Sequence, residues 1–404
     1  MNETLTSAKA AKKDEFYTRY IDIQKEVEAY LEYDPDTFRG KVVYCNCDDP
    51  FESNFFKYFA ANFNKLGLKK LITTSYDGSP IAGAQLSFLE YNKDEDERLK
   101  PTAVSIEIEE VKDINGDGAT GIEDVQLFLE KNPHTHTHLK EGGDFRSAES
   151  IGLLKEADMV VTNPPFSLFK EYVSQLVEYD KKFLIIGNVQ AITYLEIFPL
   201  IKENKAWLGA TIHSGDREFR VPDHYPLNAA SCRIDENGTK YIRVKGVRWY
   251  TNLEHGRRRQ PLNLMTMSDN LRFSKKMRVK KQYDKYDNFD AIEVGTYKDI
   301  PSDYEGMMGV PITFLDKYSP DQFEIVGYEY SDELRTKVYP KQTQVDKKGK
   351  RSSVTKLNDV CAIRVDQAPS ERTYYIVNDE YFIAPYKRLI IRHRNPRPEG
   401  KRPE

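Results

Sequence analysis

The chain has 404 residues, of which 39% are hydrophobic and 31% are charged, and its net charge is −4 at pH 7. This length allows two or three domains or one large catalytic domain with insertions, whereas the lack of a run of about 18 apolar residues excludes a membrane-spanning helix. Because the polar start MNETLTSAKAAKKDEFY is unlike a signal peptide and four scattered cysteines are too few for a disulfide framework, we expect a cytoplasmic protein with reduced thiols.

The first half of the chain alternates between strand-like and helix-like segments. Apolar residues at helical spacing predict a helix over 18–33, and the run KVVYCNC predicts a buried strand over 41–47. An amphipathic helix over 51–67, ended by Gly67, and a strand over 69–77 follow. Further along we predict a helix near 147–156, a strand over 159–162, a helix over 166–180 and a strand over 181–189. Strands near 206–212 and 241–250 are expected to continue the sheet or its antiparallel edge. This order is typical of an α/β fold with a doubly wound, mostly parallel sheet.

The second half is less regular. Residues 250–310 are basic and rich in turns, and three strand-like runs, FEIVGYEY, YYIVND and RLIIRH, lie among charged loops in the last hundred residues. We predict that the tail NPRPEGKRPE is disordered.

Charge is distributed unevenly along the chain. Residues 240–281 contain thirteen Lys or Arg against two acids, and residues 90–130 contain thirteen acids against four bases. Phosphate binding responds to the local field and not to the average charge. The basic residues alternate with aromatic and apolar ones, which favours a folded nucleic-acid surface over a flexible tail.

Chemistry is indicated most strongly by Asn163-Pro164-Pro165-Phe166, directly after a buried strand. Open α/β sheets bind ligands at the carboxyl ends of their strands. The two prolines make a rigid turn, from which the Asn163 side-chain oxygen and the Pro164 carbonyl can accept both hydrogens of an aromatic amino group. This would localise the nitrogen lone pair for attack on an electrophilic methyl group, while Phe166 stacks on a base rotated out of a duplex. The alternative is a proline-rich strand exit without chemistry.

Acids at other strand ends suggest a bound cofactor. Asp49, at the exit of the first strand, could pair with an ammonium group, and the following helix N-terminus could take a carboxylate. Asp77 lies where an acid commonly holds ribose hydroxyls, the alternative being a turn residue before Gly78. Asp144 could accept from an adenine amino group with Phe145 as an apolar wall, or could belong to the start of a helix.

Long collinear segments of the chain resemble the EcoRI-type family of adenine-specific DNA methyltransferases. The resemblance covers nearly the whole chain and rests on KKDEFYT (12–18), KVVYCNCDDP (41–50), SNFFKYFA (53–60), LGLKKLI (66–72), GDFRSAES (143–150), VVTNPPFSLFKEY (160–172), YDKKFLIIGNV (179–189), KYDNFDAI (285–292) and MGVPITFL (308–315).

This resemblance implies a class I methyltransferase (Rossmann-like) fold, S-adenosylmethionine as the donor, and methylation of adenine N6 in a short duplex site by base flipping. It implies that Phe16, Tyr17 and Thr18 pack beside the methionine part of the cofactor. It also implies a cofactor loop at Asp49, Pro50 and Phe51, cofactor-adenine contacts at Asp144 and Phe145, and a catalytic loop from Asn163, itself beside the cofactor, to Phe166. Ser53 and Asn54 stand where relatives of other classes have glycines.

The acidic stretch departs from the family pattern and contains a possible calcium loop. Asp113, Asn115, Asp117 and Asp124 take positions one, three, five and twelve of an EF-hand-like spacing, with glycine at position six. A structural Ca²⁺ ion is one interpretation, and a polar turn is the other.

We therefore expect a catalytic domain over 1–250 with an acidic insertion at 90–140, a DNA-recognition region over 251–395, and a disordered tail over 396–404.

The expected partners are double-stranded DNA, contacted by basic residues, and a functionally paired restriction endonuclease, and we expect a monomer. Cytosine N4, RNA or a glutamine amide as substrate, and an inactive DNA-binding regulator, are the alternatives. The predicted DNA-binding residues are Arg248, Arg257, Arg258, Arg259, Lys275, Lys276 and Arg278.

Overall fold

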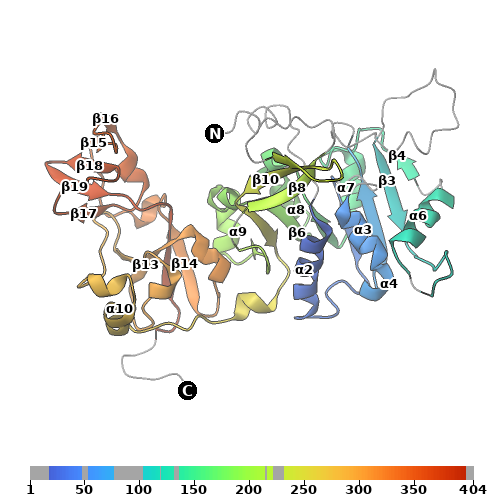
Figure 1. The fold of residues 1–404 in the computed structure, drawn as a ribbon, viewed down its shortest axis with the longest axis horizontal. Coiled ribbons are helices and arrows are strands. Elements are labelled where there is room, and N and C mark those ends of the chain that lie inside the picture. Colours follow the sequence, from blue (N-terminus) through green and yellow to red (C-terminus); the bar gives the residue numbers. More distant parts are fainter. Residues whose placement is uncertain are drawn as a thin grey trace. The chain divides into compact units, whose positions relative to one another are not determined.

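A computed structural model describes residues 18–47, 53–76, 103–118, 120–131, 136–213, 216–221 and 232–396. The chain forms two compact units, Met1–Gly256 (the N-terminal unit) and Arg257–Glu404 (the C-terminal unit), and each is described by itself (Figure 1). Among the described residues, no helix is long and apolar enough to cross a membrane.

The N-terminal unit is built on an eight-stranded mixed sheet. Four neighbouring strands are parallel in the order β2-β1-β5-β6, and antiparallel strands extend the sheet at both edges. The expectation of a mostly parallel sheet is therefore wrong, because among the described strands three pairings are parallel and four are antiparallel. In sheet order the strands are β4 (His136–His138), β3 (Val104–Ile108), β2 (Lys70–Thr74), β1 (Val42–Cys45), β5 (Met159–Thr162), β6 (Lys182–Asn188), β11 (Val247–Thr251) and β7 (Trp207–Leu208).

The parallel strands are buried along almost their whole length because both faces of the sheet are covered. On β1, Val43 and Cys45 belong to one core cluster with side chains of α2 and α3, whereas the alternating Val42 and Tyr44 are buried on the opposite face. On that face, Phe169 of α8 packs against Tyr250 of β11, with ring centroids 5.0 Å apart. The helices are α2 (Tyr20–Leu31), α3 (Asn54–Ala61), α4 (Phe63–Leu66), α6 (Ile122–Lys131), α7 (Ala148–Glu156), α8 (Phe169–Glu178) and α9 (Phe198–Lys202).

The helix predicted over 51–67 is two helices, because Asn62 leaves the helical conformation at φ −106° and ψ 13°. Its side chain donates to the carbonyl of Tyr58 at 2.9 Å, an acceptor that it shares with its own backbone N–H at 3.1 Å. The second helix, α4, ends as predicted at Gly67, which is left-handed with φ 63°.

The single strand predicted near 241–250 is also two strands. Gly246, with φ +70°, separates β10 (Lys240–Lys245) from β11, and only glycine adopts this conformation readily. β10 joins β8 (Asp216–Val221) and β9 (Cys232–Ile234) in a separate three-stranded antiparallel sheet. One glycine thus lets the chain change sheets.

Two strands of the predicted acidic insertion belong to the sheet. β3 pairs with β2, β4 pairs with β3, and Ile106 and Ile108 of β3 are buried in the core cluster. Within residues 90–140, β3 and β4 therefore form an edge of the central sheet.

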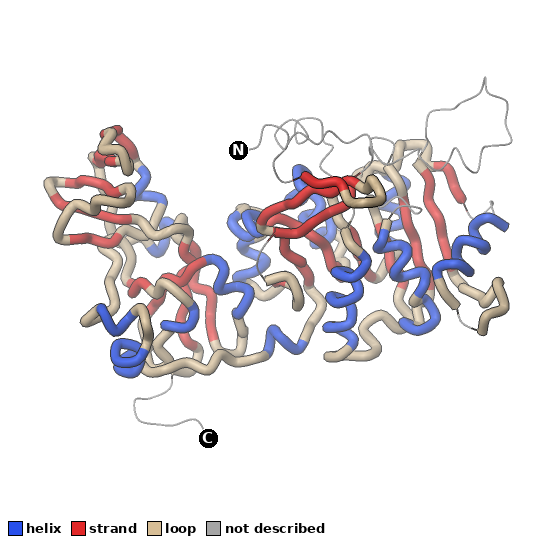
Figure 2. The backbone as a smooth tube through the Cα atoms, in the orientation of Figure 1, coloured by secondary structure: helices blue, strands red, loops and turns tan. Residues whose placement is uncertain are grey.

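The C-terminal unit consists mainly of two small sheets with short helices, as Figure 2 shows. Between them Tyr286, Phe289, Cys361 and Ile390 form an apolar core. The helix α10 (Met267–Phe273) precedes both sheets. The strands are β12 (Ala291–Glu293), β13 (Met307–Pro311), β20 (Arg388–His393) and β14 (Phe323–Tyr328) in one sheet, and β16 (Arg351–Val354), β15 (Gln342–Val345), β18 (Tyr374–Val377), β19 (Glu380–Ile383) and β17 (Ile363–Val365) in the other.

A buried ion pair crosses the four-stranded sheet. The Arg388 guanidinium donates to both carboxylate oxygens of Glu293 at 2.9 and 2.7 Å, and the Tyr286 hydroxyl donates to the same carboxylate. Each side chain of the ion pair is 9% exposed. Removing one partner of such a pair costs about 3–5 kcal/mol, because it leaves the other charge buried and alone.

Candidate functional site

The carboxyl ends of β1, β2 and β5 meet at Asn46, which directly follows β1 and is 2% exposed. Its side-chain oxygen accepts from the Cys47 amide at 2.7 Å and from the Thr74 hydroxyl at 3.1 Å. Its backbone carbonyl accepts from the hydroxyl of Thr162, the last residue of β5. Through its side chain and its backbone carbonyl, Asn46 thereby links the ends of these strands at the edge of the sheet where a ligand is expected.

Asn163-Pro164-Pro165-Phe166 leaves β5 at this edge, as predicted. Asn163 is 4% exposed, and both prolines are buried. The Pro165 carbonyl accepts from the Leu168 amide at 3.0 Å, which begins the 3-10 turn Phe166–Leu168 before α8. Phe166 is half-buried and packs against the core cluster of the sheet.

A second segment reaches the same end of the unit through α3. The Ser53 hydroxyl caps this helix by accepting from the amides of Phe55 and Phe56 at 3.1 and 3.4 Å. The Asn54 side chain donates to the backbone carbonyl of Thr18 at 2.7 Å. Thr18 therefore lies beside the start of α3, and its place beside the cofactor stays a prediction. The predicted residues Phe16, Tyr17, Asp49, Pro50, Phe51 and Asp77 lie outside the described residues.

The segment around Asp144 lies against the end of β2. Gly143 has φ +70°, and a Cβ atom there would come within 2.0 Å of the Ser75 carbonyl oxygen. Phe145 is 4% exposed and packs edge-on against Tyr172, with centroids 5.0 Å apart. The position of this segment depends on glycine, because no side chain can occupy that space.

The Asp144 carboxylate is engaged by a neighbour. Arg146 donates to its two oxygens at 2.9 and 2.6 Å, and this hydrogen bonding raises the pKa of the guanidinium. The side chain of Asp144 is 28% exposed. A contact between Asp144 and a cofactor remains a prediction, and it would have to form beside this ion pair.

The structure does not support the predicted calcium site. Asp113 accepts from the amides of Gly116 and Gly118 at 2.6 and 2.8 Å, and Asn115 accepts from the amide of Asp117 at 2.9 Å. Asp124 accepts from the amides of Ile114, Asn115 and Gly121. These oxygens close a turn before α6, and among the described residues no group of three His, Cys, Asp or Glu side chains could hold a metal ion.

Two of the predicted DNA-binding arginines are buried. Arg248 is 4% exposed, and its guanidinium donates to the carbonyls of Val247 and His213 at 2.9 and 2.7 Å. Arg258 is 5% exposed. Burial withholds both side chains from a phosphate backbone, so we remove them from the proposed DNA surface. Arg257, Arg259, Lys275, Lys276 and Arg278 are exposed.

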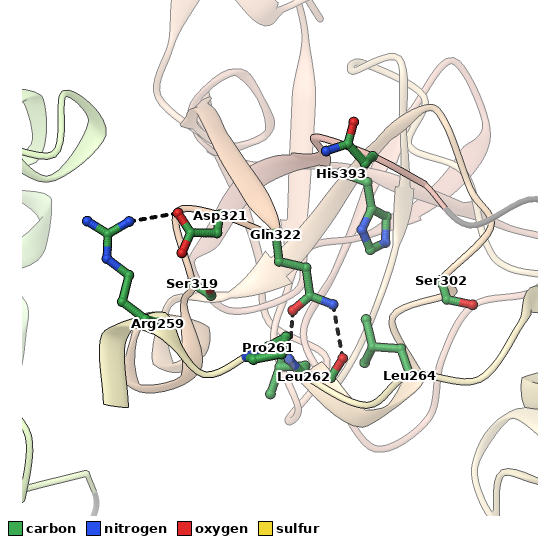
Figure 3. A pocket seen from close by; sticks show the side chains of 10 residues that line it. Arg259, Pro261, Leu262, Leu264, Ser302, Ser319, Asp321, Gln322 and His393 are labelled. Carbon is green, nitrogen blue, oxygen red and sulfur yellow. Dashed lines mark hydrogen bonds and ion pairs between the residues drawn. The ribbon is translucent and has the colours of Figure 1, made fainter. Parts of the chain in front are cut away.

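Arg259 lies at the edge of a pocket of about 270 Å³ in the C-terminal unit (Figure 3). Its guanidinium pairs with Asp321 at 2.7 Å. Next to it, the Gln322 amide accepts from the backbone N–H of Leu262 and donates to the carbonyl of the same residue, at 2.7 and 3.0 Å. The segment that leads from Arg259 to α10 is thus fixed to the sheet by one side chain.

Sequence analysis missed Asn46 because its role depends on strand neighbours that are distant in sequence. A polar residue at the end of the apolar run KVVYCNC was the available signal. The number of Lys and Arg residues in a segment likewise does not distinguish the buried Arg248 from exposed arginines. Arg248 is buried through contacts such as that with the carbonyl of His213, which lies 35 residues away in the sequence.

Comparison with known proteins identifies the family. The sequence model of the family described as adenine-specific methyltransferase EcoRI matches residues 4–394. The chain is 47% identical over 333 residues to the Type II methyltransferase M.EcoRI of Escherichia coli, covering 81% of this chain and 89% of that protein. It is 36% identical over 361 residues to the Type II methyltransferase M.MpnI of Mycoplasma pneumoniae, covering 86% and 95%. No solved structure matches the chain. A match of this length, around a sheet edge that carries Asn163-Pro164-Pro165-Phe166, means that the chain belongs to the EcoRI family of adenine-specific methyltransferases.

Proposed function

We propose that the chain transfers a methyl group from S-adenosylmethionine to the N6 amino group of adenine in a short duplex DNA site, on a base rotated out of the helix. We further propose that the N-terminal unit is a class I, Rossmann-like catalytic domain. The observation that carries this proposal is the rigid Asn163-Pro164-Pro165-Phe166 turn at the carboxyl edge of a sheet in a chain of this family.

The described residues at this edge are suited to S-adenosylmethionine, which when bound supplies a methyl group on a positively charged sulfur. The close approach of Gly143 to the Ser75 carbonyl holds the Phe145 segment against the end of β2, which supports a cofactor contact along this segment. The positive end of the α3 dipole supports a carboxylate near the start of this helix. Thr18, Ser53, Phe145 and Asn163 are the described residues proposed to hold it. Phe16, Tyr17, Asp49, Pro50, Phe51, Asp77 and Asp144 remain further candidates.

Asn163 makes the adenine amino nitrogen nucleophilic. An aromatic amine is a poor nucleophile because its lone pair is delocalised into the ring. When the Asn163 side-chain oxygen and the Pro164 carbonyl accept its two hydrogens, the nitrogen becomes more tetrahedral and the lone pair is localised on it. The low exposure of Asn163 excludes water, which strengthens both hydrogen bonds. The fixed φ of the prolines holds the acceptors in place before the base arrives.

Duplex DNA is the proposed substrate of this site, with phosphates bound by the exposed Arg257, Arg259, Lys275, Lys276 and Arg278. We propose catalysis by the N-terminal unit and recognition mainly by residues of the C-terminal unit, which begins at Arg257. A cytoplasmic monomer acting beside a paired restriction endonuclease is consistent with Type II relatives and remains a proposal.

Asn163→Ala tests the proposed chemistry. We expect the rate of label transfer from labelled S-adenosylmethionine to duplex DNA to fall at least about 100-fold, the scale on which one preorganised polar group contributes to catalysis. Cofactor and DNA affinities should change little. A variant that loses binding as well would make Asn163 a structural residue.

The same assay distinguishes the alternative substrates. The labelled nucleoside is identified after digestion of the DNA, with single-stranded RNA and a glutamine-containing peptide as competing substrates. Label on adenine supports the proposal, whereas label on cytosine, RNA or peptide, or no transfer with intact DNA binding, contradicts it.

A further inference from the structure

Residues 272–281 of the C-terminal unit combine strong positive charge with two exposed apolar side chains. The sequence RFSKKMRVKK holds six Lys or Arg and no acid. Phe273, at the end of α10, is 60% exposed, and Val279 is 81% exposed. The Arg272 guanidinium lies over the Phe273 ring, 5.0 Å from its centroid. Inside a cationic segment these two apolar side chains are available to an anionic partner, because burying them there would release water and contribute favourably.

The backbone of this segment is fixed at both ends by one residue. The Asn270 side chain, before the segment, donates to the Asp299 carbonyl at 3.3 Å, and the Tyr283 hydroxyl, after it, donates to the same carbonyl at 2.7 Å. The Ser274 hydroxyl donates to the Asp299 carboxylate at 2.6 Å, and Met277 is 5% exposed. Met277 takes the inward position, so Phe273 and Val279 are presented outward by ordered structure.

The positive charge of the segment favours an anionic partner. The exposed Phe273 and Val279 favour a partner that also has apolar surfaces between its charged groups. Lys280 pairs with Asp284 at 2.5 Å, but Arg272, Lys275, Lys276 and Arg278 remain for phosphates. DNA offers stacked bases and thymine methyl groups between two rows of phosphates. An anionic membrane would instead require a continuous apolar face on a longer helix, whereas α10 has seven residues.

We propose that residues 272–281 enter a groove of the substrate duplex, where Phe273 and Val279 contact the bases and contribute to the choice of site. This inference rests on the proposed function and adds two residues that charge alone would not identify. The neighbouring cations position the segment on the phosphate backbone, and the two apolar side chains respond to the base sequence. The Arg272 guanidinium already on one face of Phe273 leaves the other face and edge of the ring for a base.

The test compares apolar and basic substitutions in the full-length chain. The probes are a duplex containing the sequence found methylated in cells that express the chain, and a duplex of equal composition with that sequence scrambled. Phe273→Ala, Val279→Ala and the double variant Lys275→Gln/Lys276→Gln are titrated by fluorescence anisotropy over a series of salt concentrations. Val338→Ala is the matched control, since Val338 is 62% exposed in the same unit. All four variants alter exposed side chains, and their cofactor affinity is measured to verify folding.

We expect each apolar substitution to weaken binding of the methylated sequence about 5- to 100-fold, as for loss of a base contact, with little effect on the scrambled duplex. The slope of log affinity against log salt should stay the same, because no phosphate contact is lost. The double lysine variant should weaken binding of both duplexes and reduce the magnitude of this slope by about 1.8, or about 0.9 for each phosphate contact. Val338→Ala should bind as the unaltered chain.

Three results would overturn the inference. One is wild-type affinity and site preference in both apolar variants. Another is an equal loss of affinity for the two duplexes. The third is loss of binding to phosphatidylserine vesicles without any change in DNA binding, which would assign the segment to a membrane. Failure of the proposed function can be told apart from failure of this inference. In that case the unaltered chain itself would transfer no label to adenine.

Discussion

Glu329 is a buried carboxyl group in the C-terminal unit, directly after β14, and is 1% exposed. Burial raises the pKa of this carboxyl group to about 7. The backbone N–H of Arg388, which donates to the carboxylate at 3.0 Å, lowers the pKa and so offsets part of this rise. Arg388 and Lys356 favour its charged form, while Cys361 and Tyr328 are buried nearby and have raised pKa values themselves. This carboxyl group therefore changes its charge near neutral pH.

The stability of the C-terminal unit should depend on this group between about pH 4.5 and 7. The folded chain holds the proton more tightly than the unfolded chain, so the stabilisation is complete below the unfolded pKa and is lost as the pH rises through the folded pKa. Above pH 7 the ionised carboxylate costs up to about 3 kcal/mol relative to the protonated form at low pH. Glu329→Gln, which keeps the acceptor for the Arg388 amide, should flatten the pH dependence of denaturant unfolding and stabilise the chain at pH 8. An unchanged pH profile would disprove this account.

At the scale of elements, the contact between the Gly143 segment and the end of β2 is the least tolerant packing near the candidate site. Its left-handed φ and the short distance from a Cβ atom to the Ser75 carbonyl oxygen both require glycine. Gly152, in the middle of α7, provides a comparison, since within the described part of the chain a Cβ there would meet no heavy atom within 4 Å.

Gly143→Ala should lower the free energy of unfolding by about 2 kcal/mol or more and weaken cofactor binding, because the Asp144–Phe145 segment must move away from β2. Gly152→Ala should stabilise α7 by up to about 1 kcal/mol and leave cofactor binding unchanged. Thermal unfolding and a calorimetric titration with S-adenosylmethionine measure both effects. Equal behaviour of the two variants would mean that the close approach does not position the cofactor site.

The sequence predicted elements well where local patterns suffice. β5 begins and ends as predicted, because MVVT is a short apolar run before two prolines. Gly246 was overlooked because the residues on both sides of it are strand-like, although a glycine inside such a run indicates a bend. The antiparallel edge formed by β7 and β11 was one of the two predicted places for these strands, whereas the edge formed by β3 and β4 was not predicted, since it depends on which distant strands pair.

The proposed catalytic turn could be predicted because its residues are adjacent in sequence, whereas the proposed DNA surface was predicted from charge and two of its arginines are buried. Burial of Arg248 between backbone carbonyls, and the exposure of Phe273 and Val279, are properties of tertiary packing that residue types do not reveal. The turn before α6 has the residue spacing of a calcium-binding loop because the short Asp and Asn side chains that bind Ca²⁺ also accept hydrogen bonds from the backbone of turns.

At the scale of the whole molecule, the two units differ in their intrinsic fluorescence. The chain has two tryptophans, Trp207 and Trp249, and both are buried in the N-terminal unit. Tryptophan emission therefore reports unfolding of the N-terminal unit alone, whereas far-ultraviolet circular dichroism reports both units.

We expect S-adenosylmethionine at 100 times its dissociation constant to stabilise the unit that binds it by about 2.7 kcal/mol. The tryptophan transition in denaturant should move to higher concentration, and part of the circular dichroism transition should stay in place. If both signals shift together over their whole range, the units unfold as one and this prediction is wrong.

The contacts of Asp299 bear on which substitutions the C-terminal unit can tolerate. By holding Asn270, Ser274 and Tyr283, it joins the two ends of the stretch between them, so the fold depends little on most side chains within that stretch. Substitutions there can accumulate without disturbing either sheet of the C-terminal unit. If residues 272–281 contact the bases as proposed, exchanging the exposed Phe273 and Val279 while keeping the buried Met277 should alter the target sequence on an unaltered scaffold.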